Sequence, residues 1–302
     1  MLLTGTLGLS GFDTPALTAL QRRTGVSHVA SNSCPDDWHR VWQTAQMVGV
    51  GKAPQCGRKR MPELTDQTFF HLCCNPVRDA FVDAWQRGIA TVPVLLGPVS
   101  FLAACDRTDG TDPVLLLLKL LPVYIEILHE LATAGCFWVQ ITEPVTTAGP
   151  MSKERQTAME LAWRSMAEVA SGHALSLVFV GGGGGFWRNL PHVMSLPMNG
   201  LHIDMVRGGA ELPSVLSNLN QRCDLLLGVV DGLNRIPTDV YSALRWIDKI
   251  RSECPRRRVI ITPSTTMRFT NKDGRQLPPE VHNTLSDLAK VQRACVAAIF
   301  VH

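Results

Sequence analysis

The stretch that decides the fold is Val139-Gln140-Ile141-Thr142-Glu143-Pro144-Val145, which follows a long amphipathic helical pattern ending at Ala134-Gly135. A short apolar strand that ends in Glu-Pro places a carboxylate at the carboxyl end of that strand. An α/β barrel keeps its functional groups at this end of its strands. The stretch therefore indicates one strand of a parallel sheet with a polar group at its end.

Later segments repeat this arrangement, in which an apolar run is followed by a polar side chain. They are residues 201–208 with Asp204 and Arg207, residues 225–232 with Asp231, and residues 260–264 with Ser264. Because the carboxyl ends of parallel strands meet at one edge, these side chains are expected around one ligand-binding mouth.

Eight strand candidates follow one another along the chain, and helical patterns separate most of them. The strand candidates are residues 2–9, 68–73, 92–96, 137–141, 175–180, 200–205, 225–230 and 259–262. The helical patterns are residues 36–47, 75–87, 114–134, 153–171, 238–253 and 279–297. Strands that alternate with helices indicate a parallel sheet, and eight strand units favour closure into a barrel. The sequence therefore predicts an α/β fold, a (β/α)8 TIM-type barrel.

An open, doubly wound sheet is the structural alternative. The glycine run at 181–185 matches a phosphate-binding pattern only trivially. No acidic residue ends a suitably placed following strand, as a dinucleotide site requires. We expect a flexible or re-aimed loop there, with a phosphate cradle as the other interpretation.

Composition limits the class of protein. The chain has 302 residues, 45% of them hydrophobic, which is enough apolar material for one large core. Its net charge of +3 is too small to indicate a nucleic-acid-binding protein. Nine cysteines without regular spacing favour a reducing compartment, so we predict a cytoplasmic protein. The apolar residues 114–132 contain charged side chains, so we predict no membrane segment.

Several motifs in fixed order closely resemble the amino-terminal barrel of the cobalamin-independent methionine synthase family. They are residues 96–102, 121–124, 138–145, 200–208, 227–234 with Thr238-Asp239, and 262–264. The resemblance implies a single barrel domain over residues 1–302, well matched over 63–302 and divergent and shortened over 1–62. It also implies a place in methionine biosynthesis, where the whole enzyme transfers the methyl group of 5-methyltetrahydropteroyltri-glutamate, a folate, to homocysteine.

The amino-terminal segment departs from the family. Residues 11–62 resemble a linker, rich in Ser, Asn, Gly, Pro and basic residues. The family's first strand runs into a Phe-Pro-Arg signature that helps to hold the glutamate tail of the folate. Residues 6–11 occupy the corresponding place without an arginine. The resemblance therefore implies weakened binding of the tail.

Metal ligands are sparse by comparison with the family. His71 and Cys73 form an H-x-C pair on a predicted strand, but zinc needs three or four converging ligands, and a buried structural cysteine is the competing interpretation. In the family's catalytic barrel, zinc is held by His-x-Cys on the fifth strand, Glu on the sixth and Cys near the eighth. The matching places here are residues 179–181, Asp204 and residues 264–265, so we expect no zinc in this chain.

The candidate ligand-binding residues at the mouth are Glu143, His202, Asp204, Arg207, Asp231, Asn234 and Ser264. Clustered carboxylates can act as general acid and base. The alternative, which we favour, is that they cap loops and pair with arginines. His202 shares a strand face with Asp204 and is expected to be an inner-layer histidine instead of a base.

Three functions of different classes remain open. The first is a half-enzyme that binds folate and works with a separately encoded catalytic barrel, which predicts an apolar docking patch. The second is a stand-alone ligand-binding or regulatory barrel. The third is a carboxylate-based enzyme of the superfamily that includes uroporphyrinogen decarboxylase and corrinoid methyltransferases. All three take a small-molecule ligand.

Overall fold

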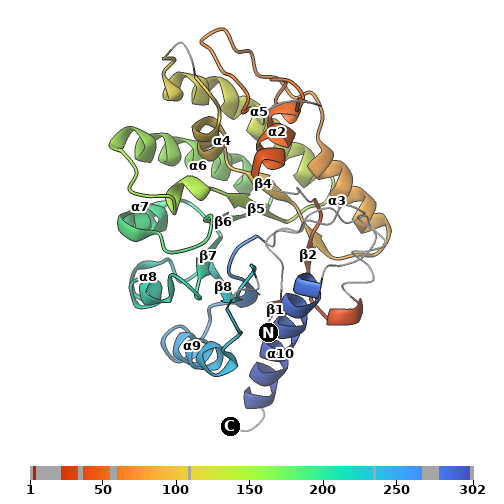
Figure 1. The fold of residues 1–302 in the computed structure, drawn as a ribbon, viewed down its shortest axis with the longest axis vertical. Coiled ribbons are helices and arrows are strands. Elements are labelled where there is room, and N and C mark those ends of the chain that lie inside the picture. Colours follow the sequence, from red (N-terminus) through yellow and green to blue (C-terminus); the bar gives the residue numbers. More distant parts are fainter. Residues whose placement is uncertain are drawn as a thin grey trace.

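The strands form a ring in the middle of the molecule and helices surround it (Figure 1). The computed structural model describes residues 3–4, 22–32, 37–54, 60–107, 110–233, 236–266 and 279–299. The strands are β1 (Leu3–Thr4), β2 (Val29–Ala30), β3 (Thr91–Val92), β4 (Val94–Leu96), β5 (Trp138–Thr142), β6 (Ser176–Val180), β7 (Gly200–Asp204), β8 (Asp224–Val230) and β9 (Val259–Pro263).

All strand pairs among the described residues are parallel. One sheet has the order β1-β9-β8-β7-β6-β5-β4, and β2 pairs with β3 just before β4. β1 and β9, which are the first and the last strand along the chain, pair with each other. The predicted α/β barrel is thus confirmed, with β3 and β4 together forming its third strand around Pro93.

The longer helices lie at the predicted places. They are α2 (Asp37–Met47), α3 (Pro76–Gln86), α5 (Pro113–Thr133), α6 (Lys153–Gly172), α9 (Val240–Glu253) and α10 (Pro279–Ile299). Sequence patterns did not predict the shorter helices α4 (Pro98–Ala104), α7 (Leu190–Ser195) and α8 (Leu212–Asn218), nor the 3-10 turns η1 (Pro144–Thr146), η2 (Trp187–Asn189) and η3 (Gly209–Glu211).

Local sequence explains where these helices begin. The side chain of Asp112 accepts a hydrogen bond from the Val114 amide at the start of α5, and that of Ser152 accepts one from Arg155 at the start of α6. Such caps satisfy amides that have no partner within the helix. Proline occupies the first position of α3, α4 and α5, where its missing N–H costs nothing.

One predicted strand is wrong. Residues 68–73 form no strand; instead the amides of His71 and Cys73 donate to the carbonyls of Val48 and Met47, the residues at the end of α2. The second barrel strand is β2, which lies within the predicted linker. A strand of two residues has no alternation for sequence reasoning to detect.

Two layers of side chains follow from the alternation along each strand. Residues on one face form a small inner cluster that includes Trp138, Val178, Leu226 and Ile260. Residues on the other face, such as Val139, pack against the surrounding helices in the main core. Both faces are therefore buried, as in other parallel sheets.

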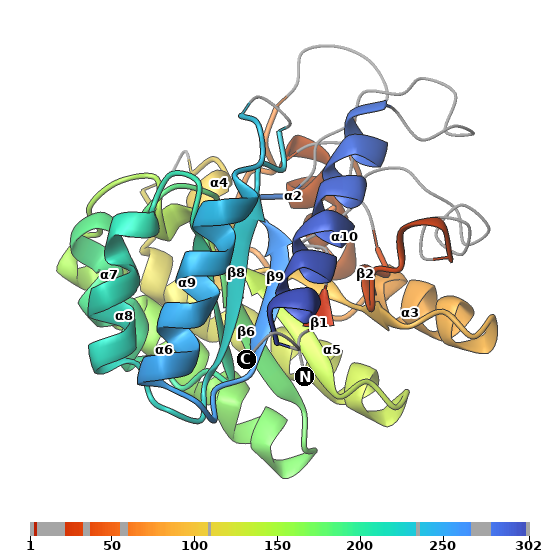
Figure 2. The same cartoon turned by 90° about the horizontal axis from the view of Figure 1, so that it is seen from below.

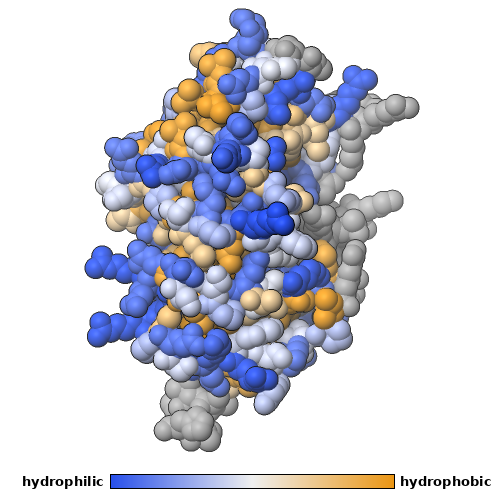
Figure 3. Space-filling view, turned by 90° about the vertical axis from the view of Figure 1, so that its left-hand side faces the viewer, coloured by the Kyte–Doolittle hydropathy of each residue, from blue (hydrophilic) through white to orange (hydrophobic). Residues whose placement is uncertain are grey.

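The face formed by the outer helices α6 to α9 is mainly hydrophilic, with hydrophobic side chains in small separate groups (Figure 3). In the side view, helices α6 and α9 run along the strands, and α2 and α4 lie toward one end (Figure 2). In the described part of the chain, no helix is long and apolar enough to cross a membrane.

Candidate functional site

His202 lies inside the barrel and is neutral. It is fully buried on β7, and its Nε2 lies 3.1 Å from the Pro263 carbonyl oxygen, to which the neutral ring can donate. Burial lowers the pKa of His202 to about 4, although this hydrogen bond and nearby Asp204 both favour the charged form. Gly228 leaves room for the ring, since a Cβ there would lie 2.8 Å from Nε2. His202 is therefore a packed inner residue at neutral pH.

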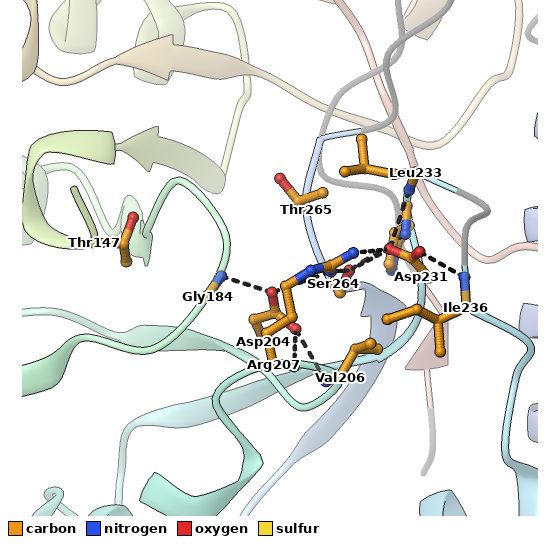
Figure 4. A network of polar contacts seen from close by, with 12 residues as sticks. Thr147, Gly184, Asp204, Val206, Arg207, Asp231, Leu233, Ile236, Ser264 and Thr265 are labelled. Atoms are coloured by element: carbon orange, nitrogen blue, oxygen red, sulfur yellow. Dashed lines mark hydrogen bonds and ion pairs between the residues drawn. The ribbon is translucent and has the colours of Figure 1, made fainter.

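Asp204, which ends β7, is held by backbone amides. Its Oδ1 accepts hydrogen bonds from the amides of Val206 (3.0 Å) and Arg207 (2.9 Å), and its Oδ2 accepts one from Gly184 (2.7 Å) (Figure 4). A carboxylate with three amide donors organises the loops around it. Asp204 thus ties the loop after β7 to the glycine run after β6.

Asp231, which follows β8, forms the second half of the same network. Its Oδ1 accepts a hydrogen bond of 2.7 Å from the Arg207 guanidinium, and its Oδ2 accepts one of 3.0 Å from the Ile236 amide (Figure 4). Arg207 also donates to the Ser264 hydroxyl at 3.1 Å. The structure therefore brings Asp204, Arg207, Asp231 and Ser264 together, while Asn234 lies outside the described residues.

Glu143 lies apart from this network. Thr142 is on the inner face of β5, and Glu143, one residue later, lies against the start of α4. Its Oε2 accepts a hydrogen bond of 2.8 Å from the Ser100 amide, and the absence of a Cβ at Gly97 makes room for its carboxylate. The side-chain period of two along a strand accounts for this separation from Asp204.

Burial also sets the charge of Glu143. The side chain is fully buried, and burial raises its pKa to about 7, an effect that the Ser100 and Val99 amides partly oppose. Its Oε1 has no hydrogen-bond partner among the described residues. Near neutral pH the group is thus close to the midpoint of its titration.

A cavity of about 310 Å³ opens at the carboxyl ends of the strands, and we call it the mouth cavity. It is lined by residues from α2, α4 and the ends of four strands, namely Asp37, Arg40, Val41, Leu96, Ser100, Ala103, Ala104, Thr142, Pro144, Val145, Ala148, Gly181, Gly182, Thr265 and Thr266. None of the predicted mouth residues that the structure describes is among them, although Glu143 and Ser264 are each adjacent in the chain to a lining residue. Whether the predicted residues bind a ligand stays a prediction.

The glycine run lines one side of the mouth cavity and is fixed by its neighbours. The Gly182 amide donates to the Thr147 hydroxyl (3.0 Å), and the Gly182 carbonyl accepts from Thr265 (3.2 Å). Gly183 and Gly184 have φ angles of 101° and 82°, which favour glycine. Two amides of the run are thus engaged with Thr147 and Asp204, which favours a loop over a phosphate cradle.

Asn189 joins two loops beside this run. Its Nδ2 donates to the carbonyls of Thr146 and Gly149 at 2.8 Å each, and its Oδ1 accepts from the Met151 amide at 3.0 Å. Asn189 is 1% exposed. The loop after β5 and the loop after β6 are therefore held together by one buried amide side chain.

The H-x-C pair lies away from the strands. Cys73 is exposed, and the His71 ring packs against Gly49, whose added Cβ would lie 2.3 Å from the ring. Across the described residues, no group of three or more His, Cys, Asp or Glu side chains is placed to hold a metal ion. The alternation that put His71 and Cys73 on one strand face does not apply, because they are on no strand.

Sequence reasoning missed Arg40 and Ser100. Both are buried and line the mouth cavity. Arg40 belongs to a predicted helix in a segment that resembled a linker, where a basic residue is expected on the surface. The apolar residues Val41, Ala45 and Met47 of the same helix were the sequence sign that α2 has an inward face.

The sequence matches the model of a known family. The model described as "Cobalamin-independent synthase, N-terminal domain" matches residues 60–255. The chain belongs to this N-terminal domain family. Its match begins close to residue 63, where the motifs of the sequence begin to resemble the family.

Relatives show how much of the family's protein this chain represents. It is 41% identical over 198 residues to a 5-methyltetrahydropteroyltriglutamate–homocysteine methyltransferase of Chelativorans sp. (strain BNC1), covering 65% of this chain and 25% of the relative. A protein of the same name from Caulobacter vibrioides is 36% identical over 242 residues, covering 78% of this chain and 31% of the relative. The chain therefore spans about a quarter to a third of these relatives.

A solved structure supports the barrel. A B12-independent methionine synthase from Shewanella sp. W3-18-1 superposes with a TM-score of 0.74, covering 99% of this chain and 98% of the other at 11% identity. At this identity the likeness concerns the fold alone.

Proposed function

We propose that this cobalamin-independent synthase N-terminal domain is the folate-binding half of a methionine synthase and works together with a catalytic barrel. The observation that carries the proposal is the family match over residues 60–255, combined with a cavity at the carboxyl ends of the strands. In this fold, ligands bind at that end of the barrel. The proposed ligand is 5-methyltetrahydropteroyltri-glutamate.

The state of Asp204 supports a binding role over methyl transfer. It is the one residue at the family's zinc positions that could coordinate a metal. Its oxygens already accept three amide hydrogen bonds, and the Arg207 guanidinium lies 3.5 Å from Oδ2. A carboxylate engaged in this way organises loops and has little capacity left for a metal ion.

The carboxylate-enzyme alternative gains little from the structure. Glu143 has a pKa near 7, which suits a proton donor or acceptor. However, Glu143 is fully buried against α4 and does not line the mouth cavity. General acid–base catalysis needs the group within hydrogen-bond reach of the substrate.

A partner barrel would dock on another face than the one in Figure 3. On that face the hydrophobic side chains form only small groups. A stable interface between two domains of one enzyme buries a larger, more continuous apolar area. We therefore expect docking at the mouth end or over α3 and α5, where exposed hydrophobic side chains include Trp85, Leu115 and Leu118.

The test is an activity assay of the purified 302-residue chain with the methylated folate triglutamate and homocysteine. We expect no methionine from the chain alone, while the full-length Chelativorans relative serves as the positive control in the same buffer. Adding a candidate catalytic barrel should give turnover that depends on both proteins. Turnover by the chain alone would contradict the proposal.

The zinc content of the same preparation provides a second test. We expect well under one zinc per chain, because zinc sites need three or four converging ligands. One tightly bound zinc per chain that is lost in His71→Ala or Cys73→Ala would contradict this expectation. The Cys254→Ala variant is the matched control, since Cys254 is distant in sequence and also partly exposed.

A further inference from the structure

Arg40 is a buried cation at the mouth cavity. It lies in the first turns of α2, which packs against β4 and α4. The residue is 7% exposed, and its neighbour Val41 is 4% exposed. Both line the cavity together with Leu96 at the end of β4. The Arg40 side chain is thus largely buried and borders the open space of the mouth cavity.

Arg40 has no anionic partner in the described part of the chain. Its backbone carbonyl accepts a hydrogen bond from Thr44, but none of the ion pairs or hydrogen bonds there involves its guanidinium. Other buried or half-buried arginines differ: Arg207 pairs with Asp231, and Arg257 donates to three backbone carbonyls. A buried charge without a partner is costly, so such groups are normally paired.

The rest of the cavity lining indicates what would pair with Arg40. Val41, Leu96 and Val145 provide apolar walls, and the hydroxyls of Thr142 and Thr265 already donate to the carbonyls of Leu95 and Gly182. Arginine offers two parallel N–H groups that match a carboxylate. A ligand with one anionic group and an apolar body therefore fits these walls.

We propose that the mouth cavity binds the carboxylate of a small organic acid through Arg40, with the apolar body of the acid packed against Val41 and Leu96. Asp37, one turn earlier on α2, is exposed at the edge of the cavity. Its negative charge disfavours ligands with several anionic groups at this position. A monocarboxylate is accordingly the favoured class over inorganic phosphate.

This inference concerns the same cavity as the proposed function but does not depend on folate. The probe is benzoate, and its neutral isostere benzamide reports the contribution of the apolar walls alone. Failure to bind folate with retained binding of benzoate would reject the proposed function and leave this site intact. If the chain binds folate but binds benzoate and benzamide equally well, this site is rejected and the proposed function is retained.

The experiment is isothermal titration at constant ionic strength near pH 7.5. We expect benzoate to bind with a Kd of about 1 mM or tighter, and benzamide to bind at least about tenfold more weakly. Equal binding of the two probes, no binding of benzoate up to about 20 mM, or tighter binding of phosphate than of benzoate would overturn the proposal.

Substitutions then test Arg40 itself. In Arg40→Gln we expect the affinity for benzoate to fall at least about tenfold and the affinity for benzamide to stay the same. Arg40→Lys keeps the charge but lacks the paired N–H groups, so its affinity for benzoate should lie between those of the unaltered chain and Arg40→Gln. Arg164→Gln is the matched control, because Arg164 is 72% exposed and pairs with Glu160 on α6. An unchanged affinity for benzoate in Arg40→Gln overturns the proposal; if that variant does not fold, the benzoate–benzamide comparison in the unaltered chain decides.

Discussion

The Glu143 carboxylate occupies the space that a side chain at residue 97 would need. A Cβ added to Gly97 would lie 2.1 Å from both Cδ and Oε1 of Glu143. Gly97 is the residue before α4, and the Ser100 amide of α4 donates to Oε2. The end of β5 and the start of α4 therefore fit together only with glycine at this position.

Gly97→Ala should destabilise the fold. Glu143 is fully buried and cannot move into solvent, so the new methyl group must displace the carboxylate or the helix. Overpacking of a buried site costs about 1–3 kcal/mol. Urea unfolding would measure the loss. Gly172→Ala at the end of α6 is the control, because a Cβ there meets nothing within 4 Å. Equal stability of the two variants would contradict the tight fit.

The pKa of Glu143 predicts how stability depends on pH. Because burial raises its pKa from 4.5 to about 7, the folded chain binds this proton more tightly than the unfolded chain. The contribution of Glu143 to stability is therefore fully present below about pH 4.5 and is lost as pH rises through 7. The loss over that range is roughly 3 kcal/mol, an order-of-magnitude figure.

Glu143→Gln should remove this slope, because the amide resembles the protonated carboxyl group. The quantity to measure is the difference in unfolding free energy between variant and unaltered chain at about pH 5, 6, 7 and 8, a range that spans the titration. The difference between the two proteins is needed because His202 changes stability with pH in the opposite direction. Its pKa is lowered from 6.5 to about 4, so its contribution to folding stability rises with pH between these values. A difference that does not grow with pH would contradict the raised pKa of Glu143.

The pair Arg207–Asp231 should stabilise the loops at the mouth. The Asp231 side chain is 1% exposed and the Arg207 side chain 32% exposed. Removing either partner leaves a charge without its partner, and we expect a loss of about 1–3 kcal/mol, reduced by the partial exposure of Arg207. A double-mutant cycle with Arg207→Gln and Asp231→Asn should show strong coupling. The exposed pair Arg78–Asp79 (46% and 65% exposed) is the control and should show almost none.

Binding of the folate tail should be weak. The family's arginine-bearing first loop corresponds here to residues 6–11, which have no arginine and lie outside the described residues. The nearest substitutes in sequence are Arg22, Arg23 and Lys52. Loss of two charge-assisted hydrogen bonds, each worth about 1.5–3 kcal/mol, weakens binding by about two or more orders of magnitude.

Isothermal titration with folate triglutamate should therefore give a Kd no tighter than about 100 μM. The monoglutamate should bind with nearly the same affinity, since the tail adds little. A Kd near about 1 μM that does not change in Arg22→Gln with Arg23→Gln would show that another surface holds the tail.

The long central strands were predictable, because an apolar run of five or more residues that ends in Asp or Glu is typical of a buried parallel strand. The two-residue strand β2 was not, and residues 68–73 were assigned to a strand although their backbone bonds to the end of α2. Grouping Glu143 with Asp204 overlooked the alternation of side chains along β5. Arg40 was missed because burial of a helical arginine depends on distant segments of the chain.

Asn189 has a thermodynamic consequence for any ligand of this mouth. Its three hydrogen bonds hold the loops after β5 and β6 in place before a ligand arrives. Ordering a loop on binding costs conformational entropy, and a loop that is already ordered avoids that cost. Association should then be limited by entry into the cavity instead of by loop closure, and the heat of binding should come mainly from the ligand's own contacts.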